Sequence, residues 1–420
     1  MEEFDKCLNS ARKVWIFTGG AHGAGGFSEN KGFRNSAGLF EEVIRWDMAW
    51  QEMAARERFV FNTARPGYNV HDINREFELC VGCYQPGAVV YIAGREDWEL
   101  PKERWQEEIS LFRERVEAMG AKLLVVEAWK QRANIFKVEE SREKDRGRTG
   151  GYPGDLDSLR EANWLLKKVC GGQCRVTEED RKRMALKPAT EVFETNGRLT
   201  LEEKPMKWLF VGDSITHGAL HTYGYDSLPQ LWEKYLREDW GRADDIVLNT
   251  GVSGATATEF LERLDIRYTP YADADVVVVM FGTNDCCFPQ DITVEKFKGQ
   301  LRRILELAKA HGSQVVLRTP QPQREDALER VKAIVPFAEA AREIALTSDV
   351  ILVDHFRNFS RIKEQEPERF EACMSDAVHP NVRGQYRMFR EMAYAVGMVK
   401  EDSMLSEDSM VSLEYRTEAL

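Results

Sequence analysis

Residues 208–214, Trp-Leu-Phe-Val-Gly-Asp-Ser, open a pattern that runs through the second half of the chain. Four apolar residues predict a short buried strand, and Gly-Asp-Ser predicts a polar loop in front of a helix. Apolar stretches recur at 246–248, 276–281, 315–317 and 350–353, and helical segments are predicted near 228–237, 259–264, 297–310, 327–345 and 386–396. Strands that alternate with helices are typical of a parallel sheet. We therefore predict a three-layer α/β/α sandwich with a five-stranded parallel sheet at residues 205–398.

The first half of the chain repeats this order. Three of its segments, 14–21, 61–67 and 87–97, match 208–214, 248–254 and 275–285 in composition and spacing. Internal repetition of this kind indicates duplication of a folding unit. We therefore predict two tandem copies, the first at residues 1–175. Two unrelated α/β domains with similar strand–loop patterns remain the alternative.

Two further segments lie outside these domains. Residues 176–204 form the predicted connector, and Asn196-Gly197 lies there between alternating apolar residues. Asn-Gly in that setting is a strong signal for a two-residue turn, so a β-hairpin is expected. Residues 399–420, in which Glu-Asp-Ser-Met occurs twice, are predicted to be a weakly ordered tail.

The composition of the chain excludes several classes of protein. A length of 420 residues and 43% hydrophobic content suit two globular cores. The net charge is −12, with 58 basic against 70 acidic residues, which argues against nucleic-acid binding and suits a small neutral substrate. Residues 1–6 lack the features of a signal peptide, and no apolar run approaches the ~20 residues of a membrane span. A cytoplasmic protein without membrane attachment is expected.

The eight cysteines are scattered, which favours free thiols in a reducing compartment. Cys80, Cys83, Cys170 and Cys174 could together supply four zinc ligands. Their wide separation and irregular spacing favour the alternative, that they pack as small apolar residues. The same interpretation is given to the adjacent Cys286 and Cys287, because no base is evident beside them.

Residues with catalytic potential follow the predicted strands. Ser214 comes directly after the first strand of the second half, at the face where α/β sheets bind ligands. A serine nucleophile needs a general base, and the base needs a partner that fixes its tautomer. Asp376 and His379, in Asp-Ala-Val-His-Pro-Asn, can supply both from a single turn beyond the last strand.

Ester cleavage also needs donors that face the developing oxyanion. Gly254 follows the second strand and offers a backbone N–H, while Asn284 follows the third strand and offers a side-chain amide. Together with the N–H of Ser214, they would provide three donors from three neighbouring strand ends.

These motifs together resemble those of the SGNH hydrolases, also called GDSL esterases or lipases. The four blocks of that family are matched in order by Ser214, Gly254, Asn284 and His379, over residues 205–398. The resemblance implies a flavodoxin-like fold, a Ser214–Asp376–His379 triad, and an oxyanion hole made by Ser214, Gly254 and Asn284. No cofactor and no metal are implied. We interpret Asp213 as a supporting hydrogen-bonding residue and His217 as a rim residue.

The first half lacks this set. The positions of the serine, asparagine and histidine read Ala21, Glu96 and Tyr152, and the glycine survives as Gly67. Residues 1–175 are therefore interpreted as a degenerate copy without a triad, which packs, forms homo-oligomers or binds a ligand. His22 and Arg95 are candidates for a polar crevice there.

The expected function is that of a cytoplasmic serine esterase acting through an acyl-serine intermediate. A small acyl group, preferably acetyl, on a polar alcohol such as a carbohydrate suits the absence of a long apolar lid segment from the sequence. A lysophospholipase or thioesterase is one alternative. A non-catalytic binding protein built from two hydrolase-like domains is the other.

Overall fold

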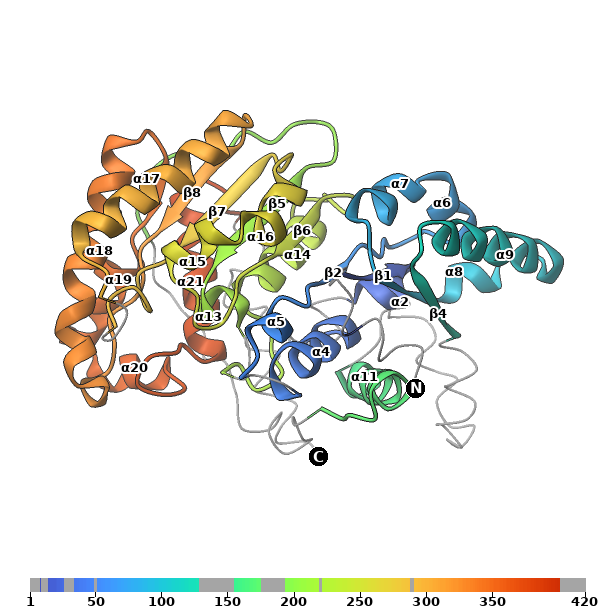
Figure 1. The fold of residues 1–420 in the computed structure, drawn as a ribbon, viewed down its shortest axis with the longest axis horizontal. Coiled ribbons are helices and arrows are strands. Elements are labelled where there is room, and N and C mark those ends of the chain that lie inside the picture. Colours follow the sequence, from blue (N-terminus) through green and yellow to red (C-terminus); the bar gives the residue numbers. More distant parts are fainter. Residues whose placement is uncertain are drawn as a thin grey trace. The chain divides into compact units, whose positions relative to one another are not determined.

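The computed structural model describes residues 8, 14–25, 34–48, 51–127, 155–174, 193–218, 221–287 and 291–400. The chain divides into two compact units, Met1–Thr177 and Glu178–Leu420, which differ in colour in Figure 1. The sequence places the end of the first domain two residues earlier, at 175. Tyr152 and residues 401–420 lie outside the described part.

The second unit is built on a parallel sheet with the strand order β6-β5-β7-β8-β9. Strand β5 lies between β6 and β7 and aligns Trp208 with Val247 on one side and with Val276 on the other. Strands buried on both faces explain the continuous apolar runs in the sequence. The order 2-1-3-4-5 is that of flavodoxin, which confirms the predicted fold. The strands are β5 (Lys207–Gly212), β6 (Ile246–Asn249), β7 (Val276–Met280), β8 (Gln314–Arg318) and β9 (Ile351–Val353).

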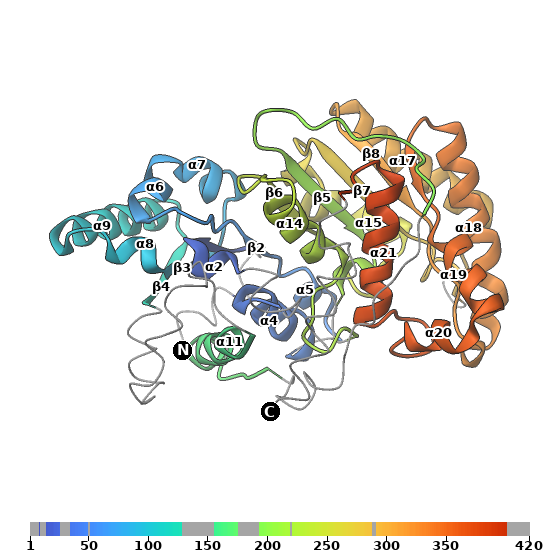
Figure 2. The same ribbon diagram turned by 180° about the vertical axis from the view of Figure 1, so that it is seen from behind.

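Helices cover both faces of this sheet. Figure 1 shows α15, α17 and α18 on one face, and Figure 2 shows α14 and α21 on the other. Trp208 of β5 packs edge-on against Trp232 of α14, with ring centroids 5.5 Å apart. The helical elements are α13 (Ser214–His217), α14 (Leu228–Glu238), α15 (Ala257–Glu262), α16 (Leu264–Arg267), η4 (Thr269–Tyr271), α17 (Val294–Ala310), η5 (Glu325–Ala327), α18 (Glu329–Thr347), α19 (His355–Gln365), α20 (Pro367–Ala372) and α21 (Val382–Ala395).

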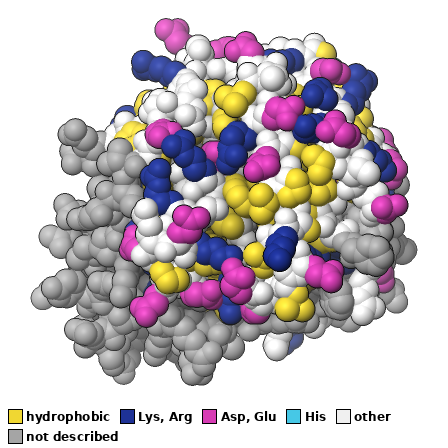
Figure 3. All heavy atoms as spheres, turned by 90° about the vertical axis from the view of Figure 1, so that its left-hand side faces the viewer, with side chains coloured by type: hydrophobic (Ala, Val, Ile, Leu, Met, Phe, Trp, Pro, Cys, Tyr) yellow, Lys and Arg dark blue, Asp and Glu magenta, His cyan; other side chains and the backbone are white. Residues whose placement is uncertain are grey.

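The side of the second unit that carries α17 and α18 faces the viewer in Figure 3. Basic and acidic side chains alternate over this face, with hydrophobic side chains between them. Leu328 and Leu346 of this region are 77% and 75% exposed. Mixed charge of this kind gives the visible face no uniformly basic area.

The first unit repeats the same strand order over its described part, as β2-β1-β3-β4, with all pairs parallel. Helix α4 packs with α11, and α6 packs with α9. The strands are β1 (Trp15–Gly19), β2 (Val60–Asn62), β3 (Ala88–Ala93) and β4 (Lys122–Glu127). The helical elements are α2 (Ala21–Ala24), α4 (Ser36–Glu42), η1 (Val43–Asp47), α5 (Met53–Arg56), α6 (Val70–Arg75), α7 (Phe77–Cys80), η2 (Gly82–Tyr84), α8 (Arg95–Trp98), α9 (Lys102–Ala118) and α11 (Asp155–Val169).

The first unit has a core of its own between β1, α4 and α11. Trp15 and Phe17 on β1 contact the ring of Phe40 on α4, with centroids 5.1 and 5.3 Å away. Leu165 and Leu166 of α11 complete this cluster, and all five side chains are fully buried. Amphipathic helices that bury one face against the sheet give the described part of the unit its layered form.

Equivalent hydrogen bonds occur within each unit at the end of its second strand. Thr63 Oγ1 donates to the carbonyl of Cys80 (2.7 Å), and Thr250 Oγ1 donates to that of Arg267 (2.9 Å). Each threonine lies 17 residues before its acceptor. In both units the preceding asparagine, Asn62 or Asn249, donates from Nδ2 to a carbonyl of the short helix after the first strand and accepts the N–H two residues ahead. The repetition therefore extends from strand order to individual side-chain contacts.

The predicted β-hairpin at the junction is wrong. Described residues 193–200 contain no strand. The N–H groups of Asn196 and Gly197 both donate to the carbonyl of Ala395 at 3.0 Å, and Leu199 N–H donates to that of Val396. Asn196-Gly197 thus lies against the C-terminal end of α21, because the last carbonyls of that helix have no partner within it and accept these N–H groups. In a hairpin the flanking strands would bond to each other instead.

No helix in the described ranges combines the length and the apolar character needed to cross a membrane.

Candidate active site

Ser214 stands at the start of α13, two residues after β5 ends. The carboxylate of Asp213 caps this helix by accepting the N–H of Ile215 at 3.0 Å. Gly212 permits the turn, since a Cβ there would lie 2.6 Å from the carbonyl oxygen of Met280. The first N–H groups of a helix have no partner within it, so the turn presents the Ser214 N–H beside its hydroxyl.

The structure brings together Ser214, from the beginning of the second unit's sequence, and Asp376 and His379, from near its end. Ser214 Oγ lies 2.9 Å from Nε2 of His379. Nδ1 of the same ring lies 2.9 Å from Oδ2 and 3.1 Å from Oδ1 of Asp376. A hydroxyl, an imidazole and a carboxylate in this sequence are the geometry of a serine triad, in which the carboxylate fixes the tautomer that lets Nε2 accept the serine proton.

Asp376 is held in its ionised form. Burial tends to raise its pKa, but the hydrogen bond and charge of His379 act against it, as do two backbone N–H bonds. These come from Val378 (2.8 Å) and His379 (2.7 Å), and both end on Oδ1. The net result is a pKa well below the usual range of an aspartate.

The loop that carries Asp376 and His379, between α20 and α21, is fastened at several points. The N–H of Ser375 donates to the carbonyl of His379, and the N–H of Arg324 donates to that of Ala377. The Gln321 amide donates to the carbonyl of Val378 at 2.7 Å. Such contacts hold the loop that carries His379 in one conformation, which a preorganised site requires.

The two predicted oxyanion residues follow the strands on either side of β5. Gly254 has a positive φ of 85°, a conformation that suits glycine, in the loop after β6. Asn284 follows β7 and donates one amide hydrogen to the carbonyl of Ala255 at 3.0 Å, which links the two loops. Within the described part of the chain, the N–H groups of Ser214 and Gly254 have no acceptor. Both therefore remain open to a ligand.

Asp285 supports both loops and was not singled out from the sequence. Its carboxylate accepts the N–H of Ala257 at 2.8 Å and that of Gly282 at 2.9 Å. In the first unit Asp97 does the same with Val70 and Gly94, both at 2.9 Å. The signal was present in both halves, as a glycine followed three residues later by aspartate.

Burial of Asp285 predicts a pH-dependent stability. Burial raises the pKa of this carboxyl to about 7, well above the usual range of an aspartate. The folded state therefore binds the proton more tightly, and the stability it contributes is present below about pH 4 and is lost as the pH rises through 7. In the wild type, the free energy of unfolding should therefore fall by on the order of 3 kcal/mol between about pH 5 and pH 8, and in Asp285→Asn this fall should be absent.

Urea unfolding of the full chain at both pH values measures this difference. The exposed Asp273, whose side chain is 69% accessible, provides the matched control Asp273→Asn. Equal pH dependence in wild type and Asp285→Asn would show that Asp285 is charged in both folded and unfolded states.

His217 differs from its expected position at the rim. It is 2% exposed, and its Nδ1 lies 2.8 Å from Oγ of Ser253, next to Gly254. Asp213 is fully buried, and burial raises its pKa to about 6. Both residues therefore lie inside the unit, behind the turns that carry Ser214 and Gly254.

His221 lies beside the triad and was missed by the sequence analysis. Its ring stacks on that of His379, with centroids 3.7 Å apart and planes 3° from parallel. Its Nδ1 is 3.4 Å from Oδ2 of Asp376. No motif surrounds His221 in the sequence, so only the folded loop reveals the contact.

One group of described residues could in principle hold a metal ion, namely His221, Asp376 and His379, whose ligand atoms lie within 4.8 Å of one another. Zinc requires lone pairs that converge on a point about 2.0–2.1 Å from each nitrogen. Because the two rings are stacked and parallel, their in-plane lone pairs run side by side. This arrangement favours a shared carboxylate over a shared ion.

The cysteines considered as zinc ligands do not form such a group among the described residues. Cys80 is buried, and Cys170 and Cys174 pack against the core of the first unit. Cys286 and Cys287 are buried, and each thiol lies 3.3 Å from the carbonyl of Thr283. Packing accounts for these five, and the partly exposed Cys83 has its thiol 3.9 Å from the carbonyl of Leu79.

In the first unit a carboxylate occupies the corresponding turn. Ala21 begins α2 as Ser214 begins α13, and Gly67 has φ 87°, close to the 85° of Gly254. The N–H groups of Ala21 (2.9 Å) and Gly67 (3.1 Å) both donate to Oε1 of Glu96. Glu96 is the residue that aligns with Asn284. A Cβ on Gly20 would lie 2.6 Å from its Oε2, so glycine leaves room for the carboxylate.

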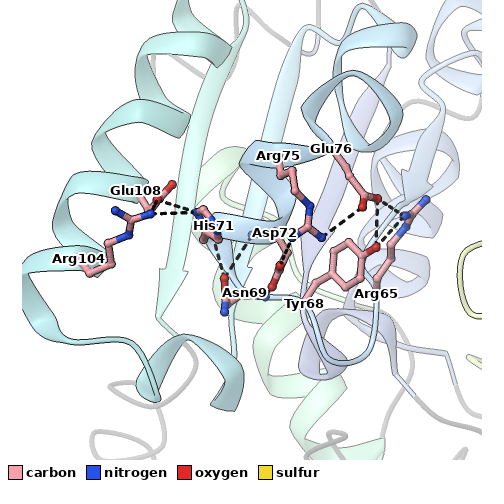
Figure 4. A network of polar contacts seen from close by, with 9 residues as sticks. All are labelled: Arg65, Tyr68, Asn69, His71, Asp72, Arg75, Glu76, Arg104 and Glu108. Carbon is pink, nitrogen blue, oxygen red and sulfur yellow. Dashed lines mark hydrogen bonds and ion pairs between the residues drawn. The ribbon is translucent and has the colours of Figure 1, made fainter.

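Ion pairs fasten the loop that carries Gly67, as Figure 4 shows. Arg65 bonds Glu76 at 2.8 Å, and the Tyr68 hydroxyl donates to the same carboxylate at 3.1 Å. Arg75 adds contacts to Asp72 (3.1 Å) and Glu76 (3.3 Å). A network of this kind fixes loop geometry more firmly than a single exposed pair does.

His22 and Arg95, the candidates for a crevice, have different surroundings. His22 is buried with Nε2 2.7 Å from Glu161, whose other oxygen accepts the hydroxyl of Ser36 at 2.7 Å. Arg95 is 64% exposed and lies 3.8 Å from Glu99.

Removal of the Glu96 carboxylate should destabilise the first unit. Glu96→Ala leaves the N–H groups of Ala21 and Gly67 without their acceptor, which should lower the free energy of unfolding by about 1–3 kcal/mol. Glu99→Ala, which removes an exposed carboxylate three residues away, should stay within about 0.5 kcal/mol of wild type. Denaturant unfolding measures both. Equal effects of the two substitutions would contradict a structural role for Glu96.

Comparison with known proteins agrees with this geometry. Residues 210–387 match the model of the GDSL-like lipase/acylhydrolase family. This domain, which contains Ser214, Gly254, Asn284 and His379, belongs to that family.

Individual proteins match this chain over a short stretch or at low sequence identity. An uncharacterized protein of Mycoplasma pneumoniae is 41% identical over 109 residues, which are 26% of this chain and 12% of that protein's length. Axe2, an acetylxylan esterase from Geobacillus stearothermophilus, is 21% identical, with 49% of this chain and 99% of that chain covered at a TM-score of 0.41. LAE5, an α/β hydrolase enzyme from the metagenome of Lake Arreo, is 19% identical, with 47% and 97% covered at a TM-score of 0.41.

Proposed function

We propose that the second unit is a serine esterase that hydrolyses a small acyl ester through an acyl-Ser214 intermediate. The observation that carries this proposal is the chain of contacts from Ser214 Oγ through both nitrogens of His379 to Asp376, each link at 2.9 Å. A histidine with a purely structural role would not need the Ser214 hydroxyl as the partner of its Nε2.

The reaction follows from these positions. Ser214 Oγ attacks the ester carbonyl carbon while His379 Nε2 takes its proton, and Asp376 stabilises the resulting imidazolium. The oxyanion accepts hydrogen bonds from the N–H groups of Ser214 and Gly254 and from the Asn284 amide. Collapse of this intermediate breaks the ester C–O bond, and the leaving alcohol takes the proton from His379. Water, deprotonated by His379, then attacks the acyl-enzyme, and its breakdown releases the acid and returns the proton to Ser214.

The preferred substrate is an acetyl ester of a polar alcohol such as a saccharide, cleaved in the cytoplasm. Support comes from the lack of a long apolar lid segment in the sequence and from the polar residues beside the triad. Tyr223 OH lies 3.4 Å from the hydroxyl of Ser375, next to Asp376, and His221 stacks on His379. A lysophospholipase or thioesterase would need an apolar surface for its acyl chain.

The first unit is proposed to be a degenerate copy of the same domain, without hydrolytic activity. The shared strand order and the equivalent bonds of Thr63 and Thr250 support this origin. Ala21 has no hydroxyl, and Glu96 holds the two N–H groups that would bind an oxyanion. Its remaining roles are packing, self-association or ligand binding.

Labelling with a fluorophosphonate probe tests the proposal. The wild-type chain should react with one equivalent of probe, and peptide mapping should place the adduct on Ser214. A panel of acetylated saccharides and p-nitrophenyl esters of increasing chain length should show highest kcat/KM for acetyl. Failure to label or to hydrolyse any ester would favour the binding-protein alternative, and a preference for long chains would favour the lysophospholipase.

A further inference from the structure

The loop after α13 places a second imidazole against the base of the triad. The rings of His221 and His379 are 3° from parallel with centroids 3.7 Å apart, which is full face-to-face contact. The contact therefore covers one face of the His379 ring.

The same residue faces the carboxylate that orients His379. Oδ2 of Asp376 lies 2.9 Å from His379 Nδ1 and 3.4 Å from His221 Nδ1. Oδ1 accepts the N–H groups of Val378 and His379 and also lies 3.1 Å from His379 Nδ1. Oδ2 is thus the oxygen that the two imidazoles share.

The two imidazoles have different charge states during the reaction. Burial lowers the pKa of His221 to about 4, with the charge of His379 as a further cause and Asp376 acting in the opposite direction. His221 therefore stays neutral near neutral pH, when His379 takes the proton of Ser214. A cation over the face of an aromatic ring is attracted to its π electrons, and a ring in that place also keeps water from the ion pair beneath it.

We propose that His221 is a positioning residue for the esterase reaction, which holds the plane of His379 by stacking and thereby keeps Nε2 directed at Ser214. This role rests on the proposed function of the second unit. It acts through His379, since Ser214 contacts Nε2 of His379 and His221 contacts the ring face. With His221 in place the side chain of His379 is 22% exposed and that of Asp376 is 45% exposed, so the His221 ring covers His379 more fully than the carboxylate.

Three substitutions separate stacking from hydrogen bonding. His221→Ala removes both, His221→Asn keeps a polar group near Asp376 without a ring, and His221→Phe keeps a ring without the polar group. We expect kcat for p-nitrophenyl acetate to fall about tenfold in His221→Ala and in His221→Asn, the size of one aromatic contact expressed as a rate. His221→Phe should retain at least about a third of wild-type kcat. KM should stay within about twofold in all three, because His221 does not contact the acyl group.

A matched control and a second readout complete the test. His311, which is exposed at the end of α17 and also contacts an aromatic ring, Tyr268, provides the control His311→Ala, which should keep full activity. The rate of fluorophosphonate labelling of Ser214 should fall in parallel with kcat. Circular dichroism confirms that each variant is folded, and the labelling rate is compared among folded variants.

The outcomes distinguish the possibilities. If His221→Ala and His221→Asn keep wild-type kcat while Ser214 still labels, the stacking role is overturned. The same holds if His221→Asn keeps activity and His221→Phe loses it. A rise in KM without loss of kcat would make His221 a substrate contact instead. An unlabelled, inactive wild-type chain would refute the proposed function itself, and the positioning role with it.

Discussion

Ser214→Ala should lower kcat for the hydrolysis of p-nitrophenyl acetate by on the order of 10⁴–10⁶, the range that removal of a triad residue has in subtilisin. Oγ is the only non-hydrogen atom removed, and its described partner is Nε2 of His379 at 2.9 Å. Alanine suits the start of a helix, so α13 and the N–H of residue 214 should remain in place. The nucleophile is lost while binding is kept, so the effect should fall on kcat.

Steady-state kinetics, fluorophosphonate labelling and thermal denaturation measure the result together. Ser110→Ala, which removes an exposed hydroxyl from α9 in the first unit, is the matched control and should keep full activity. Activity above a tenth of wild type in Ser214→Ala would remove Ser214 from the mechanism. Stoichiometric labelling that persists and maps to the first unit would reveal a second nucleophile.

Asn284→Ala should have the second-largest effect and lower kcat by about 10²–10³. Loss of one oxyanion-hole donor in subtilisin lowers kcat by this amount. The amide donates one hydrogen to the carbonyl of Ala255. Its second hydrogen is the candidate donor to the oxyanion, which carries more charge than the ester carbonyl and so gains more from the bond. KM should therefore change little.

Asn284→Asp sharpens this test. The carboxylate has the size of the amide but offers no N–H, and its charge opposes the oxyanion, so its kcat should fall at least as far as in Asn284→Ala. Measuring kcat and KM for both variants separates the roles. A change confined to KM would assign Asn284 to substrate binding.

The sequence predicted the parts of this molecule that depend on local pattern. Apolar runs such as 276–281 specify buried parallel strands, and β7 occupies Val276–Met280. The triad residues could be proposed because Gly-Asp-Ser directly follows a strand, at the edge of the sheet where ligands bind, and because Asp-Ala-Val-His supplies a base with its partner from a single turn. What was missed depends on contacts between distant segments. His221 has no motif, and its position is evident from the stacked ring of His379.

Two errors have the same origin. Asn196-Gly197 predicted a hairpin from neighbours in sequence, but its N–H groups bond to Ala395 about 200 residues away. His217 was placed at the rim because it adjoins Ser214, yet its partner is Ser253 on the next loop, which draws the ring inward. Local propensity cannot anticipate such partners, because the fold creates them.

The Glu96 carboxylate gives the two units different responses to dissolved acids. A group attached to the chain is present at its site at a high effective concentration, of millimolar order even for a flexible tether. A free carboxylate, including acid released by hydrolysis, must exceed that level to displace Glu96 from Ala21 and Gly67. The N–H groups of Ser214 and Gly254 have no such occupant among the described residues, so we expect accumulating product acid to compete at the second unit.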